Sequence, residues 1–354
     1  MFTHPAPLAR YRFTARVQQP LTLPDYAGSL LRGQFGAALR HVACMTRQPT
    51  CPGCPLIQSC LYTRIFESPP PPKGSHALQD FSQIPNPYII EPPTPGARVL
   101  DADDDLVFHL VLVGHATQQL ALIIFALQRA LHQGLTHQRV PVDLLQVDLV
   151  DAAGGTQPVW MIEQQTLRDH LAEVSLDDIK TIADSAYPIR ARGQNDHEVT
   201  LTIQTPLRLQ QQGRPLGIGQ LTPHALIATL VRRVALLMDF HAGPGRPTGP
   251  GSSSPIPVSP VGAAVSTGTW GKAARAVSHL AGQLTDRQEL HWFDWIRYSS
   301  RQQQSMTLGG VLGRWTLQGD TDTLAQIRPW LWLGQWLHVG KNATMGLGQY
   351  QLDN

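Results

Sequence analysis

Hydrophobic and polar positions alternate along the first part of this chain in patterns that predict both strands and helices. Residues 10–18 (RYRFTARVQ) follow the period of two that is typical of a half-buried strand. Residues 26–42 place apolar side chains at helical spacing, directly after Pro24 and Asp25. The next predicted elements are a strand over residues 106–114, a helix over 118–133 and a strand over 140–150. The order strand, helix, strand, helix, strand is typical of a ferredoxin-like α+β unit.

The second half of the chain repeats this order of elements. It predicts strands over residues 198–209, 292–298, 306–318 and 349–352, and helices over residues 223–240 and 322–337. Residues 243–260 consist largely of Gly, Pro and Ser, and they predict a loop. We therefore predict an α+β fold with two tandem ferredoxin-like (RRM-like) domains, formed by residues 1–194 and 195–354.

Composition and charge narrow the classes of protein that fit this pattern. The chain has 354 residues, of which 42% are hydrophobic and 15% charged, and this length suits two globular domains. We see no signal peptide and no run of about eighteen apolar residues, so we expect a cytoplasmic protein without a membrane span. The net charge is only +2, but both ends are basic and the middle is acidic, and 24 of the 28 basic residues are Arg. Arginine suits RNA phosphates and bases, although a genome that prefers arginine codons would give the same composition.

All four cysteines of the chain lie within seventeen residues, in the pattern C-x6-C-x2-C-x5-C. In a cytosolic protein such clustering favours a metal site over disulfides. The Cys-Pro-Gly-Cys turn presents two thiolates to one ion, and the outer two cysteines can complete a tetrahedron. We predict a metal-binding insertion over residues 44–60 with a structural zinc ion, and a [4Fe–4S] cluster is the alternative. The predicted ligands are Cys44, Cys51, Cys54 and Cys60.

A glycine-rich stretch, LHVGKNATMGLGQY, occupies residues 337–350 after the last predicted helix. It is not a nucleotide-binding Walker A loop, because Gly340-Lys341 is followed by Asn342 and a helix precedes the loop. Glycines permit positive φ angles and expose backbone N–H groups that can bind phosphates, and Lys341 adds a positive charge. A tight connection between a helix and a strand would need glycines as well, so the residues alone leave both interpretations open.

Four motifs in this order resemble one family. They are LLRGQFGAALRHVAC (30–44), the cysteines followed by LYTRIFES (61–68), WIRYSSRQQQSMTLGGVLG (295–313) and the terminal glycine-rich stretch. Together they resemble the CRISPR-associated endoribonucleases of the RAMP superfamily, which cut precursor CRISPR RNA within its repeats. In that superfamily the terminal loop is usually Gly-x-Gly, five or so residues, then Gly-x-Gly. Here His338 stands where the first glycine is expected.

The resemblance implies two tandem ferredoxin-like domains, in agreement with the repeated order of elements, and a role in antiviral defence. It also implies metal-independent cleavage, in which the 2′-hydroxyl of the RNA attacks the adjacent phosphorus. The products would carry a 2′,3′-cyclic phosphate and a 5′-hydroxyl. The implied partners are CRISPR repeat RNA, as part of precursor CRISPR RNA, and a CRISPR effector complex that would receive the product.

Such a reaction needs a base, an acid and cations that stabilise the charged phosphorane. Histidine suits proton transfer near neutral pH, and His41 lies where related enzymes often have a catalytic histidine, although it could also interact with the helix C-terminus. His338, next to the glycine-rich loop, is the second candidate, and Tyr298 could hydrogen-bond to RNA or stack on a base. The residues expected to contact RNA are Arg32, Arg40, Arg297, Arg301, Gly340, Lys341, Gly346 and Gly348.

Two other functions fit parts of the same pattern. A RAMP subunit that binds RNA without cutting it would use the same loop and arginines. A zinc-dependent hydrolase would use the cysteines directly, but four thiolates saturate zinc and leave no position for water. The sequence therefore favours the endoribonuclease.

Overall fold

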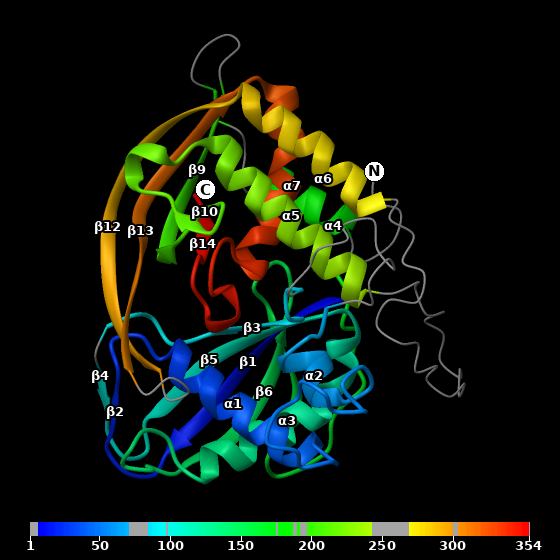
Figure 1. The fold of residues 1–354 in the computed structure, drawn as a ribbon, viewed down its shortest axis with the longest axis vertical. Helices are drawn as coiled ribbons and strands as arrows, with labels where there is room; N and C mark the ends of the chain where they lie inside the picture. Colours follow the sequence, from blue (N-terminus) through cyan, green and yellow to red (C-terminus); the bar gives the residue numbers. More distant parts are fainter. Residues whose placement is uncertain are drawn as a thin grey trace.

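The computed structural model describes residues 6–70, 84–96, 98–174, 176–186, 190–191, 197–242, 269–299 and 304–353. These residues form two α+β units that lie one above the other in Figure 1, with the N-terminal unit below and the C-terminal unit above. The loop predicted over residues 243–260 lies outside the described residues. Within the described part of the chain, no helix is long and apolar enough to cross a membrane.

The N-terminal unit is built on an antiparallel sheet with the strand order β3-β5-β1-β6-β7. Its strands are β1 (Leu8–Val17), β3 (Tyr88–Glu91), β5 (Asp105–Val113), β6 (Val142–Val150) and β7 (Thr156–Met161). Helix α1 (Gly28–Ala43) lies between β1 and β3 in the chain, and α3 (Leu120–His132) lies between β5 and β6. The four strands β3-β5-β1-β6 with these two helices have the topology of a ferredoxin-like domain.

The C-terminal unit repeats this topology with the strand order β12-β13-β9-β14, and β8 (Arg190–Ala191) pairs with β9. Its main elements are β9 (His197–Leu207), α5 (Pro223–His241), β12 (Thr285–Ser299), β13 (Gln304–Gly319), α7 (Thr321–Leu337) and β14 (Tyr350–Leu352). The chain order β9-α5-β12-β13-α7-β14 corresponds to that of the first unit. The predicted α+β fold of two tandem ferredoxin-like domains is therefore confirmed.

Apolar and polar side chains alternate along β1, so one face of the first sheet is buried in the core and the other carries charged side chains. Tyr11 and Phe13 are fully buried in the core beneath α1 and α3. Arg10, Arg12 and Arg16 point to the other face of the sheet, because successive side chains of a strand alternate. There each arginine meets a carboxylate: Arg12 with Asp148 on β6 and Arg16 with Asp105 on β5, the two strands that flank β1, and Arg10 with Glu91 on β3, one strand further away. The basic N-terminal part of the sequence is thus partly neutralised by the acidic middle.

Strands β12 and β13 form a long hairpin that pairs continuously from Thr285↔Gln318 to Ser299↔Gln304. In Figure 1 this hairpin curves from the top of the C-terminal unit down to the N-terminal unit. Its first strand begins at Thr285, earlier than predicted, because residues 285–291 (TDRQELH) are polar and largely exposed and so give no hydrophobic signal. Trp295 of the hairpin contacts Tyr26, which precedes α1, and so brings the C-terminal unit next to this helix.

Shorter elements complete the two units. They are α2 (Leu61–Phe66), β2 (Leu21–Leu23), β4 (Arg98–Leu100), α4 (Leu176–Ala186), β10 (Gln210–Gln211), β11 (Arg214–Pro215) and α6 (Thr269–Leu280). Helix α4 precedes the predicted boundary at residue 194, yet its Ile179 and Ala183 belong to the core of the C-terminal unit. Leu8 and Val113 of the first sheet join the same core, so the two units share a buried apolar interface.

The end of α5 makes a second contact between the units. Gly114, which begins a 3₁₀ turn (Gly114–Gln119) after β5, has a φ of 59°, and a Cβ atom there would collide with the carbonyl of His241. His241 is 3% exposed, its Nε2 lies 2.7 Å from the Pro85 carbonyl oxygen, and its ring lies 5.2 Å from that of His115. Burial lowers the pKa of His241 to about 3 and that of His115 to about 4. Both imidazoles are therefore neutral at physiological pH.

Candidate functional site

The glycine-rich loop runs from the end of α7 to the start of β14 and is bound tightly to the end of β9. The N–H of Val339 donates to the Gly348 carbonyl, and the N–H of Gly348 donates to Pro206. The N–H of Lys341 donates to Arg208, and the Thr205 hydroxyl donates to the Gly346 carbonyl at 2.7 Å. The loop is thus fastened across its own ends and to the strand beside it.

The three glycines of the loop are needed for this close packing. Gly340, Gly346 and Gly348 have φ angles of 91°, 91° and 73°, which side chains rarely permit. A Cβ atom at Gly348 would collide with the Val339 carbonyl, and one at Gly340 would lie 2.5 Å from the Arg208 carbonyl oxygen. The structure therefore supports the packing interpretation of the glycines. Several of the N–H groups that were expected to face a phosphate are bonded within the protein, and the exposed cation of the loop is the side chain of Lys341.

The loop also joins the two units at the start of α1. The Tyr26 hydroxyl donates to the Met345 carbonyl at 2.8 Å, and a Cβ atom at Gly28 would collide with the same oxygen. Trp295 of the long hairpin packs edge-on against Tyr26, with ring centroids 4.6 Å apart. Tyr26, Trp295, Met345 and Leu347 form one buried apolar cluster. The loop, the hairpin and the first helix are therefore held in a fixed arrangement, with the loop at its centre.

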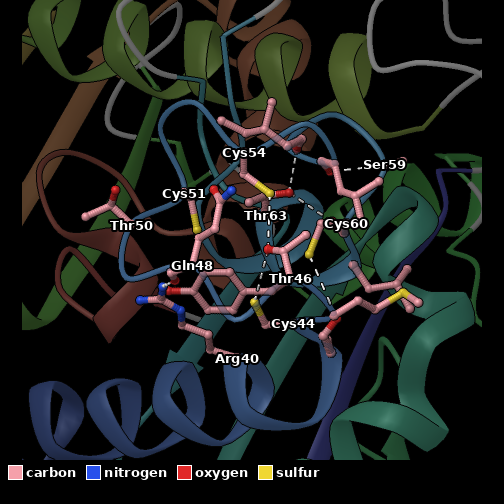
Figure 2. Close-up of a pocket in the computed structure, with 16 residues that line it drawn as sticks. Arg40, Cys44, Thr46, Gln48, Thr50, Cys51, Cys54, Ser59, Cys60 and Thr63 are labelled. Atoms are coloured by element: carbon pink, nitrogen blue, oxygen red, sulfur yellow. Dashed lines mark hydrogen bonds between the residues drawn. The ribbon is translucent and has the colours of Figure 1, made fainter.

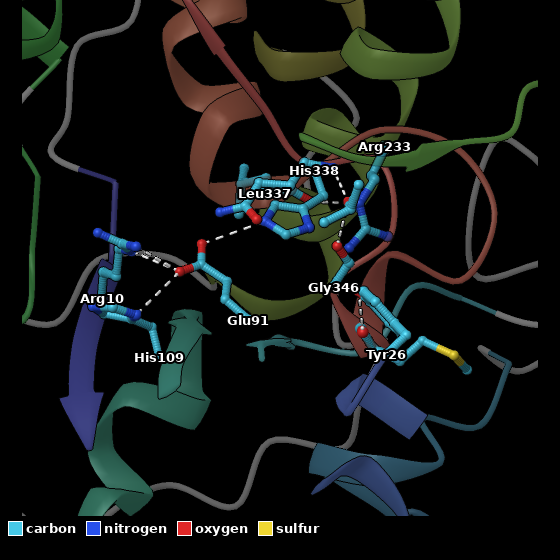
Figure 3. Close-up of polar contacts among 11 residues, drawn as sticks. Arg10, Tyr26, Glu91, His109, Arg233, Leu337, His338 and Gly346 are labelled. Atoms are coloured by element: carbon cyan, nitrogen blue, oxygen red, sulfur yellow. Dashed lines mark hydrogen bonds and ion pairs between the residues drawn. The ribbon is translucent and has the colours of Figure 1, made fainter. Parts of the chain in front are cut away.

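His338, a predicted catalytic residue, is completely buried beside this cluster. Its Nε2 lies 3.3 Å from Oε1 of Glu91 on β3, and none of its surface is exposed. Its backbone has φ 55° and ψ 165°, a conformation that is strained for a residue with a side chain. The contact with Glu91 joins the loop to the first sheet, as Figure 3 shows. The structure gives His338 a structural contact and no exposed face that RNA could reach.

Glu91 is the centre of a buried charge network that includes His338. The guanidinium of Arg10 donates to Oε2 of Glu91, with Nε at 2.8 Å and Nη2 at 2.7 Å, and His109 Nδ1 lies 3.9 Å from the same oxygen (Figure 3). Burial alone would raise the pKa of Glu91, but the hydrogen bond from His338 and the charges of Arg10, His338 and His109 lower it to about 2. Glu91 is therefore a carboxylate over the whole physiological range of pH.

His41, the first catalytic candidate, lies in the last turn of α1 and is exposed. The loop contacts the opposite end of this helix at Gly28, and thirteen residues of helix separate the two by about 20 Å. The structure therefore does not bring His41 and His338 together. His41 is accessible to a large ligand, whereas His338 is not.

The two predicted arginines of α1 have different surroundings. The Arg32 guanidinium lies 4.5 Å from the centre of the Phe66 ring, a cation–π arrangement that leaves it partly buried. Arg40 donates from Nη2 to the carbonyls of Gln48 and Pro49, at 2.6 and 2.8 Å, and so orders the segment that carries the cysteines. Each arginine already has a partner within the protein.

Of the hairpin residues expected to bind RNA, the structure describes only the backbone of two. Arg297 and Tyr298 lie on β12, opposite Met306 and Ser305, near the tip of the hairpin. Their side chains, and the whole of Arg301, lie outside the described residues. Their positions on the strand place them at the same end of the hairpin as Trp295, which contacts Tyr26.

The four cysteines line a single cavity of about 240 Å³ beside the end of α1, as Figure 2 shows. All four are free thiols, and the Thr46 hydroxyl lies between Cys44 and Cys54, 4.0 and 3.4 Å from their sulfur atoms. Partial burial would raise the pKa of Cys44, but hydrogen bonds from Arg47 and Thr46 and the charge of Arg40 lower it. As the side chains stand, no group of three or more possible metal ligands converges on one point in the described part of the chain. The set of sulfur donors in one cavity nonetheless fits a zinc ion or an iron–sulfur cluster.

Several residues of the site gave no signal in the sequence. Glu91, Arg10, Tyr26 and Trp295 come from four distant segments and meet only in the folded chain. Arg233 of α5 is a further such residue, because its Nε donates to the Leu337 carbonyl at 2.8 Å and so caps the helix before the loop. The one signal in this part of the loop was His338 at a position where a glycine is expected.

Comparison with known proteins links both halves of the chain to described families. Residues 201–350 match the family model described as CRISPR-associated endoribonuclease Cas6, and residues 6–172 match a model described as an N-terminal domain (AF_1859_N). An uncharacterized protein of Archaeoglobus fulgidus is 28% identical over 125 residues, which are 35% of this chain and 41% of that protein. This chain therefore matches less than half the length of that relative.

Solved structures resemble the whole chain in fold. The product complex of Cas6 (TTHB231) from Thermus thermophilus has a TM-score of 0.53 and 16% identity, and the match covers 98% of this chain and 99% of that one. A partial Cas6-RT-Cas1–Cas2 complex has a TM-score of 0.54 and 14% identity, with 99% of this chain and 46% of that chain covered. At these identities the likeness concerns the fold, which is that of tandem ferredoxin-like domains.

Proposed function

We propose that this protein binds CRISPR repeat RNA and cleaves precursor CRISPR RNA, because residues 201–350 match the family model of the CRISPR-associated endoribonuclease Cas6. The observation that carries the proposal is that the family match covers the glycine-rich loop, with its exposed Lys341, and both strands of the hairpin. An RNA transcript as substrate places the proposed activity in the cytoplasm. The cleaved RNA would then pass to a CRISPR effector complex.

The proposed reaction is a transesterification within the RNA. The 2′-oxygen of one nucleotide attacks the adjacent phosphorus, the bond from phosphorus to the 5′-oxygen of the next nucleotide breaks, and a 2′,3′-cyclic phosphate forms. A base takes the proton of the 2′-hydroxyl, and an acid gives a proton to the leaving 5′-oxygen. Because the nucleophile belongs to the RNA, the reaction as proposed uses no metal ion.

Accessibility decides which described residue is the better candidate for proton transfer. The His41 side chain is exposed in the last turn of α1, so RNA could reach its imidazole. His338 is fully buried against Glu91, so we propose that it positions the loop and takes no part in proton transfer. Lys341, on the loop that contacts α1 about 20 Å from His41, would contribute positive charge to another phosphate of the RNA backbone, and Arg32 and Arg40 would act mainly by ordering α1 and the cysteine segment. Tyr298, Arg297 and Arg301 stay candidates for RNA contact from the tip of the hairpin.

We also propose that Cys44, Cys51, Cys54 and Cys60 hold a structural zinc ion, with a [4Fe–4S] cluster as the alternative. Four thiols from one short segment line one cavity, and none of them forms a disulfide. Such an ion would join the end of α1 to the start of α2. Its role would be to order the segment next to His41, and it would take no part in cleavage.

One experiment tests the reaction. The protein is incubated with precursor CRISPR RNA from its own array in excess EDTA, and the ends of the products are analysed. We expect cleavage at one position of each repeat, with 2′,3′-cyclic phosphate and 5′-hydroxyl ends. RNA binding without cleavage would instead favour a non-catalytic RAMP subunit, and cleavage that stops when metal is removed would favour a metal-dependent nuclease.

The His41→Ala variant tests the proton-transfer role. We expect cleavage to slow by about 10²- to 10⁴-fold with RNA affinity unchanged, because general acid–base catalysis contributes factors of this size. Arg47→Ala, on the nearby exposed segment, is the matched control. Full activity of His41→Ala would remove this residue from the proposed mechanism.

A further inference from the structure

A polar cavity of about 310 Å³ lies between the two units, at the C-terminal end of the glycine-rich loop. It is bounded by the first sheet, the β6–β7 turn, and α7, β9 and β14 of the C-terminal unit. The residues of interest in its lining are Arg10, Glu91, Gln204, Gln335, Gln349 and Gln351. Its size falls at the lower end of the range for small-molecule sites, which suits a ligand group of a single ring system.

Each charged side chain that lines this cavity has a partner within the protein, and Asp151 keeps its negative charge. The Arg10 guanidinium donates twice to the Glu91 carboxylate, at 2.7 and 2.8 Å. Asp151, at the turn, accepts from the N–H groups of Ala153 and Gly155 at 2.9 and 2.8 Å. No other Lys, Arg, Asp or Glu lines the cavity. The cavity therefore offers no free cation for a phosphate and favours an uncharged ligand group.

Four glutamines supply the remaining polar atoms, and each retains hydrogen-bonding capacity. Gln204 donates from Nε2 to Oε1 of Gln351 at 2.9 Å. Oε1 of Gln204 and Nε2 of Gln351 are therefore available to a ligand. Gln335 accepts the N–H of Leu352 at its Oε1, and its Nε2 has no partner among the described residues. The side-chain amide of Gln349 makes no hydrogen bond within the described part of the chain. Both donors and acceptors are thus available in one cavity that offers no free cation.

We propose that this cavity binds one unpaired nucleobase of the RNA and contributes to the recognition of its sequence. Amide side chains present a donor and an acceptor side by side, which is the arrangement that reads the edge of a base. Proteins read single-stranded RNA in this way, with bases turned out of the stack and hydrogen-bonded along their edges. The proposal rests on the proposed function, since it takes RNA to be the ligand of the protein.

The position of Gln349 connects this cavity to the glycine-rich loop. Gln349 follows Gly348 directly, and its own N–H donates to the Thr205 hydroxyl at 2.9 Å, so its backbone is fixed where the loop ends. Trp336 of α7 also lines the cavity and supplies an aromatic surface at its edge. An RNA strand whose backbone passes Lys341 could therefore place a neighbouring base beside Gln349. The loop would hold the backbone, and the cavity would select the base.

The test uses a pool of RNA oligonucleotides of random sequence, so that no knowledge of the repeat is needed. The wild-type protein and the Gln349→Leu and Gln204→Leu variants are each incubated with the pool, and the bound RNA is sequenced. Gln326→Leu, an exposed position on α7 outside the cavity, is the matched control. Because the Gln349 amide has no partner in the described protein, its replacement should leave the fold intact, and circular dichroism and thermal unfolding verify this.

We expect the wild type to prefer one base at one position of the bound RNA, and Gln349→Leu to weaken this preference by about 5- to 150-fold, the range of one lost bidentate contact. Gln204→Leu should weaken the preference at the same position, and Gln326→Leu should match the wild type. A wild type that binds RNA with no base preference, or variants that keep it unchanged, would overturn the inference and leave the proposed function standing. Equal loss in the control would overturn it too. A wild type that binds no RNA from the pool would refute the proposed function as well.

Discussion

Replacing His338 with glycine and with alanine separates two opposing contributions to the stability of the loop. The backbone of His338 has φ 55° and ψ 165°, which strains any residue that has a Cβ atom. Its imidazole is fully buried and contacts the Glu91 carboxylate at 3.3 Å. Both substitutions remove the contact with Glu91, but only glycine relieves the strain. The difference between the two variants therefore measures the strain less the cost of glycine's greater freedom in the unfolded chain.

The structure sets the size of each contribution. The pKa of Glu91 is about 2, compared with 4.5 for a free side chain, and this shift corresponds to about 3 kcal/mol of net stabilisation after the cost of burial has been offset by the partners. Loss of one partner of a buried charge pair costs about 3–5 kcal/mol, and Arg10 continues to neutralise Glu91, so we expect His338→Ala to lose about 3 kcal/mol. Strain of this kind is worth about 1–3 kcal/mol. Glycine recovers it but loses up to about 1 kcal/mol through its greater freedom in the unfolded chain.

We therefore expect His338→Gly to be more stable than His338→Ala by about 1 kcal/mol, measured as the free energy of unfolding in urea. The usual order is the reverse, because alanine at an ordinary helical position is more stable than glycine by about 1 kcal/mol. Ala37→Gly, on the exposed face of α1, provides this reference within the same protein. If His338→Ala equals or exceeds His338→Gly in stability, the conformation of the loop is not strained in the way described.

Four further outcomes follow from the structure. Gly348→Ala should lower the free energy of unfolding by about 2 kcal/mol or more, since its Cβ would collide with the Val339 carbonyl at a φ of 73°, and urea unfolding would measure this. The depressed pKa of His241, about 3 against 6.5 for a free imidazole, means that the unfolded chain takes up a proton first as pH falls. Stability should therefore be highest above pH 6.5 and decline towards pH 4, and His241→Gln should flatten this slope in thermal unfolding. Lys341→Ala should weaken RNA binding and reduce the slope of log affinity against log salt by about 1, whatever the RNA sequence. Elemental analysis should find metal bound to the wild type, a strong chelator should lower its Tm, and Cys54→Ser should be insensitive to the chelator.

The main elements of both domains were predictable because their periodicity is strong and local. The predicted strand over residues 106–114 is β5 (Asp105–Val113), and the predicted helix over 322–337 is α7 (Thr321–Leu337). Elements with a weak or absent hydrophobic signal were missed. β3 (Tyr88–Glu91) has only four residues, and its burial on both faces removes the alternation by which a strand is predicted. Yet β3 carries Glu91, so this omission concealed the centre of the charge network.

The site was predictable only where one segment of the chain determines it. The glycines and Lys341 follow from the loop alone, and the four cysteines from their spacing. The contact between His338 and Glu91 joins residues 247 positions apart, and no local pattern indicates it. A histidine near a phosphate-binding loop predicted catalysis, because the residue type suits proton transfer. The sequence does not reveal that a loop residue is buried. Because His338 is buried against Glu91, we propose that it positions the loop and takes no part in catalysis.

The arrangement of the loop also determines how RNA would be bound. If the backbone N–H groups bound the phosphate, the side chains of the loop would contribute little to RNA binding, and any glycine-rich loop of this length could bind RNA. Here the N–H groups of Val339, Lys341 and Gly348 are bonded to carbonyls of the protein itself. These three N–H groups are not available to a phosphate, so we expect the side chains that the loop places, Lys341 and Gln349, to contribute to RNA contact. The loop acts as a fixed frame between the hairpin, α1 and β9, and changes within it should alter RNA cleavage through the positions of these side chains.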